Sequence, residues 1–283
     1  MSIKMVRSLK EYLSAVEIAE EAIKQKIDKN NEIAEEDKPT VRFFYRGQCN
    51  CSWNPVPSLF RAIDEVDEAT KFLSAPTLYK EEQYLIQESK RWYPALFREC
   101  KSDVEKMTVA QHYEIPTRLL DVSENAFVAL YFAANGTGDT RKEHEPDGKV
   151  FVFRTCAEQY RIASTLGGFD KMTIEGFQQR NDLMLNGKPV LVFPSMMTER
   201  QRAQGGAFFL FQNEVPSGTM IPFDKQDYEE ILISGSCKKS IRDELAARYG
   251  ISKEVLFPES LTYRKNRLVD DAKKRIRADF PQK

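Results

Sequence analysis

The chain has 283 residues, enough for one large domain or two small ones with a substantial hydrophobic core. Hydrophobic residues make up 41% of it and charged residues 30%, which are ordinary globular fractions and exclude wholesale disorder. The 42 basic residues nearly balance the 43 acidic ones, for a formal net charge of −1. No global field therefore indicates nucleic-acid binding, although a local basic patch is compatible with this balance.

Cysteines and histidines are too few and too scattered to indicate a metal site. Of five cysteines only Cys49 and Cys51 are close, with one residue between them, whereas paired zinc ligands have two to four. The two histidines, His112 and His144, are far apart, so we expect no bound metal. Residues 1–7 lack a continuous apolar run and no segment approaches the length of a membrane span. We expect a cytoplasmic protein with reduced thiols and no membrane partner.

Helices are expected to dominate the N-terminal half. Apolar residues at helical spacing predict a helix over residues 8–29, and the charged run 28–38 indicates a solvated loop. Residues 41–47 predict a strand, because they are β-branched and aromatic and end at a glycine. Helical spacing returns over residues 78–97 and 104–112.

Residues 111–133 carry the most chemical information. Their first half is expected to be a loop, because its proline disfavours a helical conformation in the residue before it. Ser123 stands at the expected N-cap of the next helix, which is apolar nearly all round and therefore buried. We expect Arg118, Asp121 and Asn125 on or beside the N-terminus of this core helix, where backbone N–H groups can hold an anionic ligand.

The second half is predicted to be rich in strands. A polar, glycine-containing surface loop is expected over residues 136–148. Short β-type runs follow at residues 149–153, 190–193, 207–211 and 230–233. Helices are predicted over residues 238–249 with Gly250 as the stop, over 253–256, and from 259 into a basic tail. This order predicts an α+β fold in a single mixed domain, with a helix-rich N-terminal half, a central β-sheet and a helical C-terminus.

Several motifs resemble those of the FRG-domain family, which is named for an aromatic–Arg–Gly motif. That motif is Tyr45–Arg46–Gly47 in this chain, followed by Gln48. Residues 111–133 resemble the family's signature of Gln-His-aromatic, Pro-Thr-Arg-Leu-Leu-Asp and Ala-Leu-aromatic-Phe-Ala. Residues 204–208 and 250–258 are similar to two later stretches of the family.

The resemblance covers about residues 40–260, with departures at Glu114, where the family often has glycine, and at Ala126, where it often has proline. Together with the helical spacing and charge at the two ends, it predicts an N-terminal helix and charged loop (1–38), an FRG-like domain (39–260) and a basic C-terminal helix (261–283). The family recurs in prophages and bacterial defence islands, but its name supplies no reaction.

Arg46 is the first candidate catalytic residue. A strand that ends in aromatic–Arg–Gly also resembles the opening motif of ADP-ribosyltransferases, in which an arginine or histidine positions NAD. The resemblance implies NAD as the substrate and a central β-sheet split as in ADP-ribosyltransferases. A guanidinium offers a fork of donors to phosphate or ribose oxygens, and Gly47 would let the ligand approach the backbone closely. Arg46 and Gly47, together with Tyr45 and Gln48, form the predicted NAD-binding segment. Alternatively, Arg46 bridges a buried carboxylate and Gly47 serves a turn.

Arg118, Asp121 and Asn125 form the second predicted part of the NAD site. Arg118 would meet the pyrophosphate, and Asp121 would accept from ribose hydroxyls or orient Arg118. The structural alternative is an internal Arg118–Asp121 pair that fixes the loop and caps the helix. The two interpretations are compatible, because binding sites need such supports.

Gln204 is the second candidate catalytic residue. It lies before the strand at 207–211, where an ADP-ribosyltransferase carries a third motif that usually ends in a catalytic glutamate. That glutamate stabilises the positive charge formed as nicotinamide leaves. This chain has Gln-Gly-Gly from Gln204 instead, although Glu199 and Glu214 flank the region. The alternative is a glycine-rich turn.

Together these features predict a NAD-dependent ADP-ribosyltransferase that modifies a macromolecule, RNA, DNA or protein, as a bacterial toxin or phage-defence effector. An antitoxin protein is a further possible partner. The chain has no Walker loop and no nucleophile elbow. Two alternatives stay open: a non-catalytic sensor of a nucleotide or phosphorylated ligand that controls a partner, and a NAD glycohydrolase. The basic tail indicates a solvated face or a guide for a nucleic-acid or protein acceptor.

Overall fold

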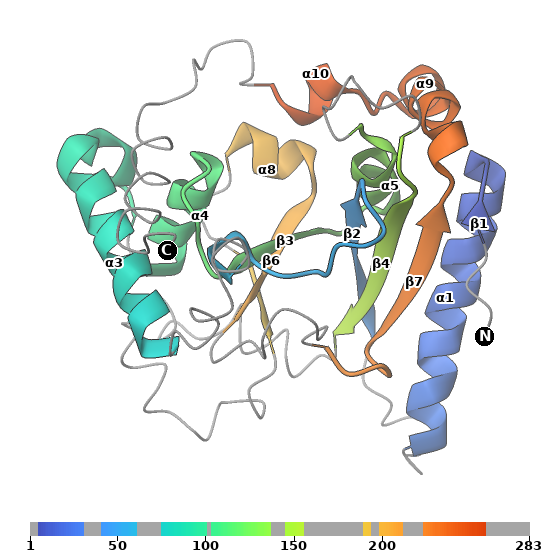
Figure 1. Ribbon diagram of the computed structural model, residues 1–283, viewed down its shortest axis with the longest axis horizontal. Coiled ribbons are helices and arrows are strands. Elements are labelled where there is room, and N and C mark those ends of the chain that lie inside the picture. The colour runs from blue at the N-terminus through green and yellow to red at the C-terminus, as the bar shows by residue number, and fades with distance from the viewer. Residues whose placement is uncertain are drawn as a thin grey trace, which may run out of the picture.

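The computed structural model describes residues 5–30, 41–60, 75–100, 103–136, 145–155, 189–193, 198–211 and 223–258. In these ranges the chain forms one mixed seven-stranded sheet with helices packed against it (Figure 1). The strands are β1 (Met5–Val6), β2 (Arg42–Gln48), β3 (Leu119–Ser123), β4 (Gly148–Thr155), β5 (Val190–Val192), β6 (Gly206–Leu210) and β7 (Tyr228–Ile233). The helices are α1 (Leu9–Asn30), α3 (Ala75–Trp92), α4 (Asp103–His112), α5 (Ala126–Ala134), α8 (Glu199–Ala203), α9 (Lys238–Tyr249) and α10 (Lys253–Leu256), with 3-10 turns η3 (Pro94–Phe97) and η5 (Gly235–Cys237).

The sheet consists of two well-paired parts that meet at one point. Its strand order is β1-β7-β4-β2-β3-β6-β5, with β1 parallel to β7 and every other pair antiparallel. β2 pairs with β4 along its whole length, and β3 pairs with β6 at all five of its positions. β2 and β3, by contrast, are in register at Tyr45↔Ser123 alone. Residues of β2 beyond Tyr45 therefore have no ladder partner on β3.

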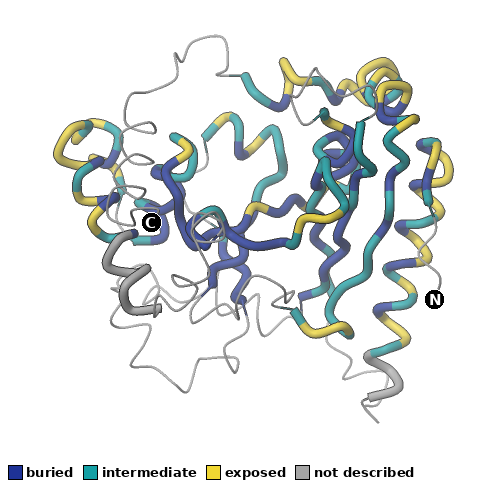
Figure 2. Tube along the Cα trace, viewed as in Figure 1, coloured by how far each residue is buried: buried dark blue, intermediate teal, exposed yellow. Residues whose placement is uncertain are grey.

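Helices cover one face of the sheet. α1, α5 and α9 bury the valines and isoleucines of β4 and β7, while α3 and α4 cover the part formed by β3, β5 and β6. Figure 1 shows α3 and α4 at one end of the sheet and α1 at the other. The opposite face is rich in phenylalanine, and the segment after β2 packs on it through Val56, Leu59 and Phe60. Most strand residues are buried or half-buried, and the outer sides of α1, α3 and α9 are exposed (Figure 2).

Most predicted elements match the structure to within a few residues, and two differ. The helix predicted over residues 78–97 ends at Trp92 and continues as η3. Pro94 explains this end, because proline has no N–H to donate and disfavours a helical conformation in the residue before it. Residues 119–123, expected to be a loop, form β3. The predicted basic helix at 261–283 and much of the loops at 28–38 and 136–148 lie outside the described residues.

Residues 5–30 belong to the same sheet and core as the rest. Met5 and Val6 pair with Leu232 and Ile233 of β7. Tyr12 of α1 is fully buried, and its hydroxyl donates to the carbonyl of Ala126 at 2.8 Å. Among the helices that the structure describes, none is both long and apolar enough to cross a membrane.

Candidate functional site

Polar groups gather at the end of β3, around the hydroxyl of Ser123. This hydroxyl donates to the carbonyl of Gln204 at 2.6 Å and accepts from the backbone N–H of Asn125 at 3.0 Å. The prediction that Ser123 is the N-cap of the apolar helix is therefore wrong. Its backbone belongs to the sheet, and the cap is Asn125, whose side chain accepts from the N–H of Phe127 at 2.9 Å. The helix itself is buried as expected, with Leu130 fully enclosed.

Arg46 lies where β2 and β3 cease to pair. Its Nη1 donates to the backbone carbonyl of Asp121 at 2.6 Å and lies 3.8 Å from the Asp121 carboxylate oxygen Oδ2. The guanidinium thus satisfies a β3 carbonyl beside the only register pair of the two strands, Tyr45↔Ser123. The Arg46 side chain is 13% exposed and that of Asp121 is 62% exposed. The arginine is held firmly, and the carboxylate faces solvent.

Gln204 joins this group through its backbone. It is the C-cap of the short helix α8, and its side-chain Nε2 donates to the carbonyl of Leu256 at 3.0 Å. Gly205 follows with a φ of 54°, a left-handed conformation that glycine adopts without strain. Arg46, Asp121, Ser123, Asn125 and Gln204 are hereafter called the Arg46 cluster.

A second arginine on β2 pairs with a carboxylate just past β3. Arg42 forms an ion pair with Glu124, and both side chains are 41% exposed. The backbone N–H of Glu124 donates to the carbonyl of Gly205 at 2.9 Å, which ties the turn after β3 to the turn before β6. This ion pair lies beside the Arg46 cluster, since Glu124 directly follows Ser123.

The other residues of the aromatic–Arg–Gly segment have partners away from Asp121. The Tyr45 hydroxyl donates to Glu20 of α1, and burial, followed by this hydrogen bond, raises the pKa of Tyr45 well above its ordinary value. Gln48 is buried, and its Nε2 donates to the carbonyl of Asn54 at 3.1 Å. The close approach expected at Gly47 is that of a helix, because a Cβ atom there would lie 1.8 Å from the carbonyl oxygen of Ala129 in α5.

Arg118 is engaged elsewhere. Its Nε lies 2.7 Å from Oε2 of Glu82, and its backbone N–H donates to Oε1 of the same carboxylate at 2.8 Å. The two side chains are 4% and 0% exposed. The predicted internal pair of Arg118 with Asp121 is therefore wrong, and the partner is Glu82 of α3. Of the predicted site residues, the structure brings Arg46 to Asp121, joins Asn125 and Gln204 through Ser123, two residues further along β3, and places Arg118 with α3.

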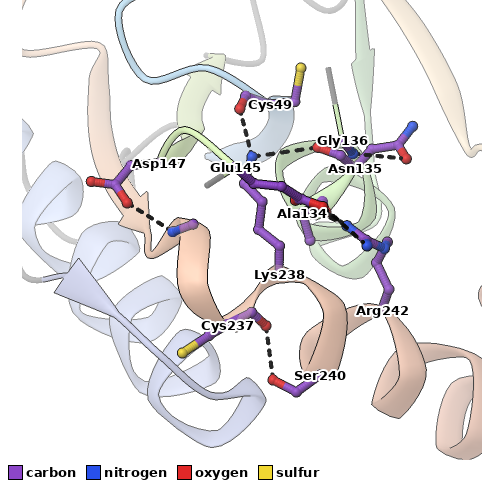
Figure 3. Close-up of polar contacts among 11 residues, drawn as sticks. Cys49, Ala134, Asn135, Gly136, Glu145, Asp147, Cys237, Lys238, Ser240 and Arg242 are labelled. Atoms are coloured by element: carbon purple, nitrogen blue, oxygen red, sulfur yellow. Dashed lines mark hydrogen bonds and ion pairs between the residues drawn. The ribbon is translucent and has the colours of Figure 1, made fainter. Parts of the chain in front are cut away.

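A second polar group, centred on Lys238, supports the end of β2 (Figure 3). Lys238 is fully buried, and its ammonium donates to the carbonyls of Cys49 at 2.6 Å and Asn135 at 3.4 Å. Arg242, one turn further along α9, donates to the carbonyl of Ala134. Both cations sit at the C-terminus of α5, where the helix dipole favours positive charge. Burial lowers the pKa of Lys238. This group fixes α5 and the turn after β2 relative to α9.

Neither Ser123 nor Lys238 was predicted in these roles. The alternation in Leu-Leu-Asp-Val-Ser at 119–123 could have indicated a strand that presents Asp121 to solvent. The residues around Lys238 give no such signal, because a lysine at the start of a helix is ordinarily exposed. In the described part of the chain, no three histidine, cysteine or acidic side chains are placed to hold a metal ion.

The family model of the FRG domain matches residues 41–142. The match runs from the start of β2 past the end of α5 and so includes Arg46, Asp121, Ser123 and Asn125. Comparison with curated proteins and with solved structures finds no match. β4, which pairs along all of β2, and β6, which pairs along all of β3, lie beyond the matched range.

Proposed function

We propose that this protein binds NAD at the Arg46 cluster and transfers its ADP-ribose to a macromolecule. The observation that carries the proposal is the juxtaposition of the Arg46 guanidinium and the solvent-facing carboxylate of Asp121, where β2 and β3 separate. A guanidinium is suited to phosphate or ribose oxygens, and a carboxylate to ribose hydroxyls. The single register pair between β2 and β3 supports a sheet split as in ADP-ribosyltransferases.

Arg46 is a better candidate than Arg118 for the contact with the NAD pyrophosphate. A ligand that drew Arg118 away would leave the Glu82 carboxylate buried without its partner, and breaking such a buried pair costs about 3–5 kcal/mol. Arg46 instead borders an exposed carboxylate, and partly exposed ion pairs contribute only about 0–1 kcal/mol. Asp121 can therefore be displaced or can turn to the ligand at little cost.

Asn125 and Gln204 have supporting roles in this proposal. The Asn125 side chain caps α5, and the Gln204 amide holds α10, so both polar ends are already used within the protein. Ser123 connects the two residues and fixes them beside Asp121. The acceptor is RNA, DNA or protein, and the cellular role follows the family's occurrence: a cytoplasmic toxin or phage-defence effector, controlled by an antitoxin where one exists.

The test is incubation with NAD labelled in its adenylate part, together with cell extract that contains protein, RNA and DNA. Nicotinamide release and a labelled macromolecule are expected, and Arg46→Ala should abolish both while the protein still melts cooperatively, with a loss of stability no larger than that of the control below. Arg154→Ala is the matched control, because Arg154 is also mostly buried and pairs with an aspartate, Asp227, at 2.6 Å. Nicotinamide release without labelling would identify a NAD glycohydrolase. Nucleotide binding without either product would identify a sensor.

A further inference from the structure

We infer that Asp121 is the catalytic carboxylate of the reaction proposed above, an inference that rests on that proposed function. Cleavage of a glycosidic bond builds positive charge on the sugar, and glycoside-cleaving sites stabilise that charge with a carboxylate. Gln204 carries an uncharged amide, and this amide is engaged with the carbonyl of Leu256. The negative charge must therefore come from another residue near Arg46.

Asp121 occupies the place that this chemistry requires. β3 lies between β2, which carries Arg46, and β6, where the glutamate of the third motif was expected. Asp121 is in register with Phe208 of β6, and on the side of β2 its carbonyl accepts a hydrogen bond from the Arg46 guanidinium. It thus stands next to both strands that would contribute to the site.

The surroundings of the Asp121 side chain leave it available to a ligand. Leu120 and Val122 on either side are buried, yet the Asp121 side chain is 62% exposed. Its carboxylate lies 3.8 Å from Arg46, beyond hydrogen-bond length, since the short bond from Arg46 goes to the backbone carbonyl. The arginine is therefore anchored by the main chain of β3, and the carboxylate is held beside it with its oxygens facing solvent.

Other acidic residues near the cluster fit less well. Glu124 is bound in its ion pair with Arg42. Glu199 lies in the first turn of α8, at the opposite end of that helix from Gln204. Glu214, the other residue considered for this role, lies outside the described residues.

In the reaction, the bond between C1′ of the ribose and the nicotinamide nitrogen breaks, and nicotinamide leaves with the bonding electron pair. The positive charge left on the ribose faces the Asp121 carboxylate, while Arg46 holds the pyrophosphate. The nucleophilic atom of the acceptor then forms its bond to C1′, and the proton it carried passes to solvent. No oxidant or reductant takes part, and the products are nicotinamide, the ADP-ribosylated acceptor and one proton.

The experiment compares Asp121→Asn with Glu124→Gln, two exposed carboxylates three residues apart that each lose one charge. Asp121→Asn should lower kcat for nicotinamide release by about 10²-fold or more, the scale for losing a charge-stabilising group. Its dissociation constant for NAD should rise far less than kcat falls, because the asparagine amide oxygen still accepts from ribose hydroxyls, and its melting temperature should stay close to that of the unaltered protein. Glu124→Gln should keep kcat within about threefold, and Asp121→Glu should restore part of the activity because it keeps the charge.

Two outcomes would overturn the role of Asp121 and leave the proposed function standing. In the first, the unaltered protein is active and Asp121→Asn keeps kcat within about threefold of it. The other is a loss confined to NAD affinity, which would make Asp121 a binding residue. If the unaltered protein binds NAD but releases no nicotinamide, the proposed function fails, and the assignment of Asp121 fails with it for that separate reason.

Discussion

Two arginines that look alike in the sequence have different roles in the structure. Arg46 bonds to a backbone carbonyl and borders an exposed carboxylate, whereas Arg118 is buried against Glu82. The spacing of Arg118 and Asp121 suggested a local pair, but Asp121 lies within β3, whereas Arg118 precedes the strand and its guanidinium is taken by Glu82. The partner Glu82 lies 36 positions upstream on a helix, and no local pattern connects it with Arg118.

The Arg118–Glu82 pair gives a prediction about stability. Arg118→Ala should lower the free energy of unfolding by about 3–5 kcal/mol, because it leaves the Glu82 carboxylate buried and uncompensated. Urea denaturation measures this change. The double variant Glu82→Leu with Arg118→Met should lose clearly less free energy of unfolding than Glu82→Leu and Arg118→Met lose together as single variants, since residues in direct contact are coupled. If Arg118→Ala kept its free energy of unfolding within about 1 kcal/mol but no longer bound NAD, Arg118 would be an NAD-binding residue, as first predicted.

At the scale of elements, the sequence predicts those with a clear period or a clear end. α9 ends at Gly250, whose φ of 64° is the left-handed conformation expected after a helix. β3 was missed because its alternation of apolar and polar residues is short: it runs only from Leu120 to Ser123, and Leu119 before it is buried as well. An alternation of four residues is the shortest that indicates a strand.

Gly47 allows the packing of α5 on β2 to be tested. Gly47→Ala should destabilise the fold by about 1–3 kcal/mol or more, because the added Cβ would lie 1.8 Å from the backbone oxygen of Ala129, and a helix backbone cannot turn aside as a flexible side chain can. Gly250→Ala is the control, since nothing lies within 4 Å of a Cβ there and the strain is that of the left-handed φ, roughly 1 kcal/mol. Thermal melting of both variants checks this order. Equal losses would mean that α5 can shift away from β2.

At the scale of the whole molecule, the order of the strands is the part that the sequence could not supply. The two-residue strand β1 is too short to have a period, yet it pairs in parallel with β7. The single contact between β2 and β3 also depends on strands far apart in the chain, Arg42–Gln48 and Leu119–Ser123. The motifs identified Arg46, Asp121, Asn125 and Gln204 as site residues. They could not show that the Ser123 hydroxyl donates to the carbonyl of Gln204, 81 residues further on.

β1 and α1, both in the N-terminal segment, cover part of the core. Removal of residues 1–38 would delete β1 and α1 and expose part of the core that they cover, including Val150, Val152 and Ile231. Newly exposed apolar patches of this kind favour aggregation, so we expect a shortened protein that is poorly soluble and lacks a cooperative thermal transition. Tyr12→Phe is the graded control: it removes one buried hydrogen bond, to the carbonyl of Ala126, and should melt cooperatively with a loss of about 1–3 kcal/mol. A soluble shortened protein that melted cooperatively near the temperature of the full chain would show instead that residues 39–260 fold without α1, because their own contacts would then suffice to hold α5 on the sheet.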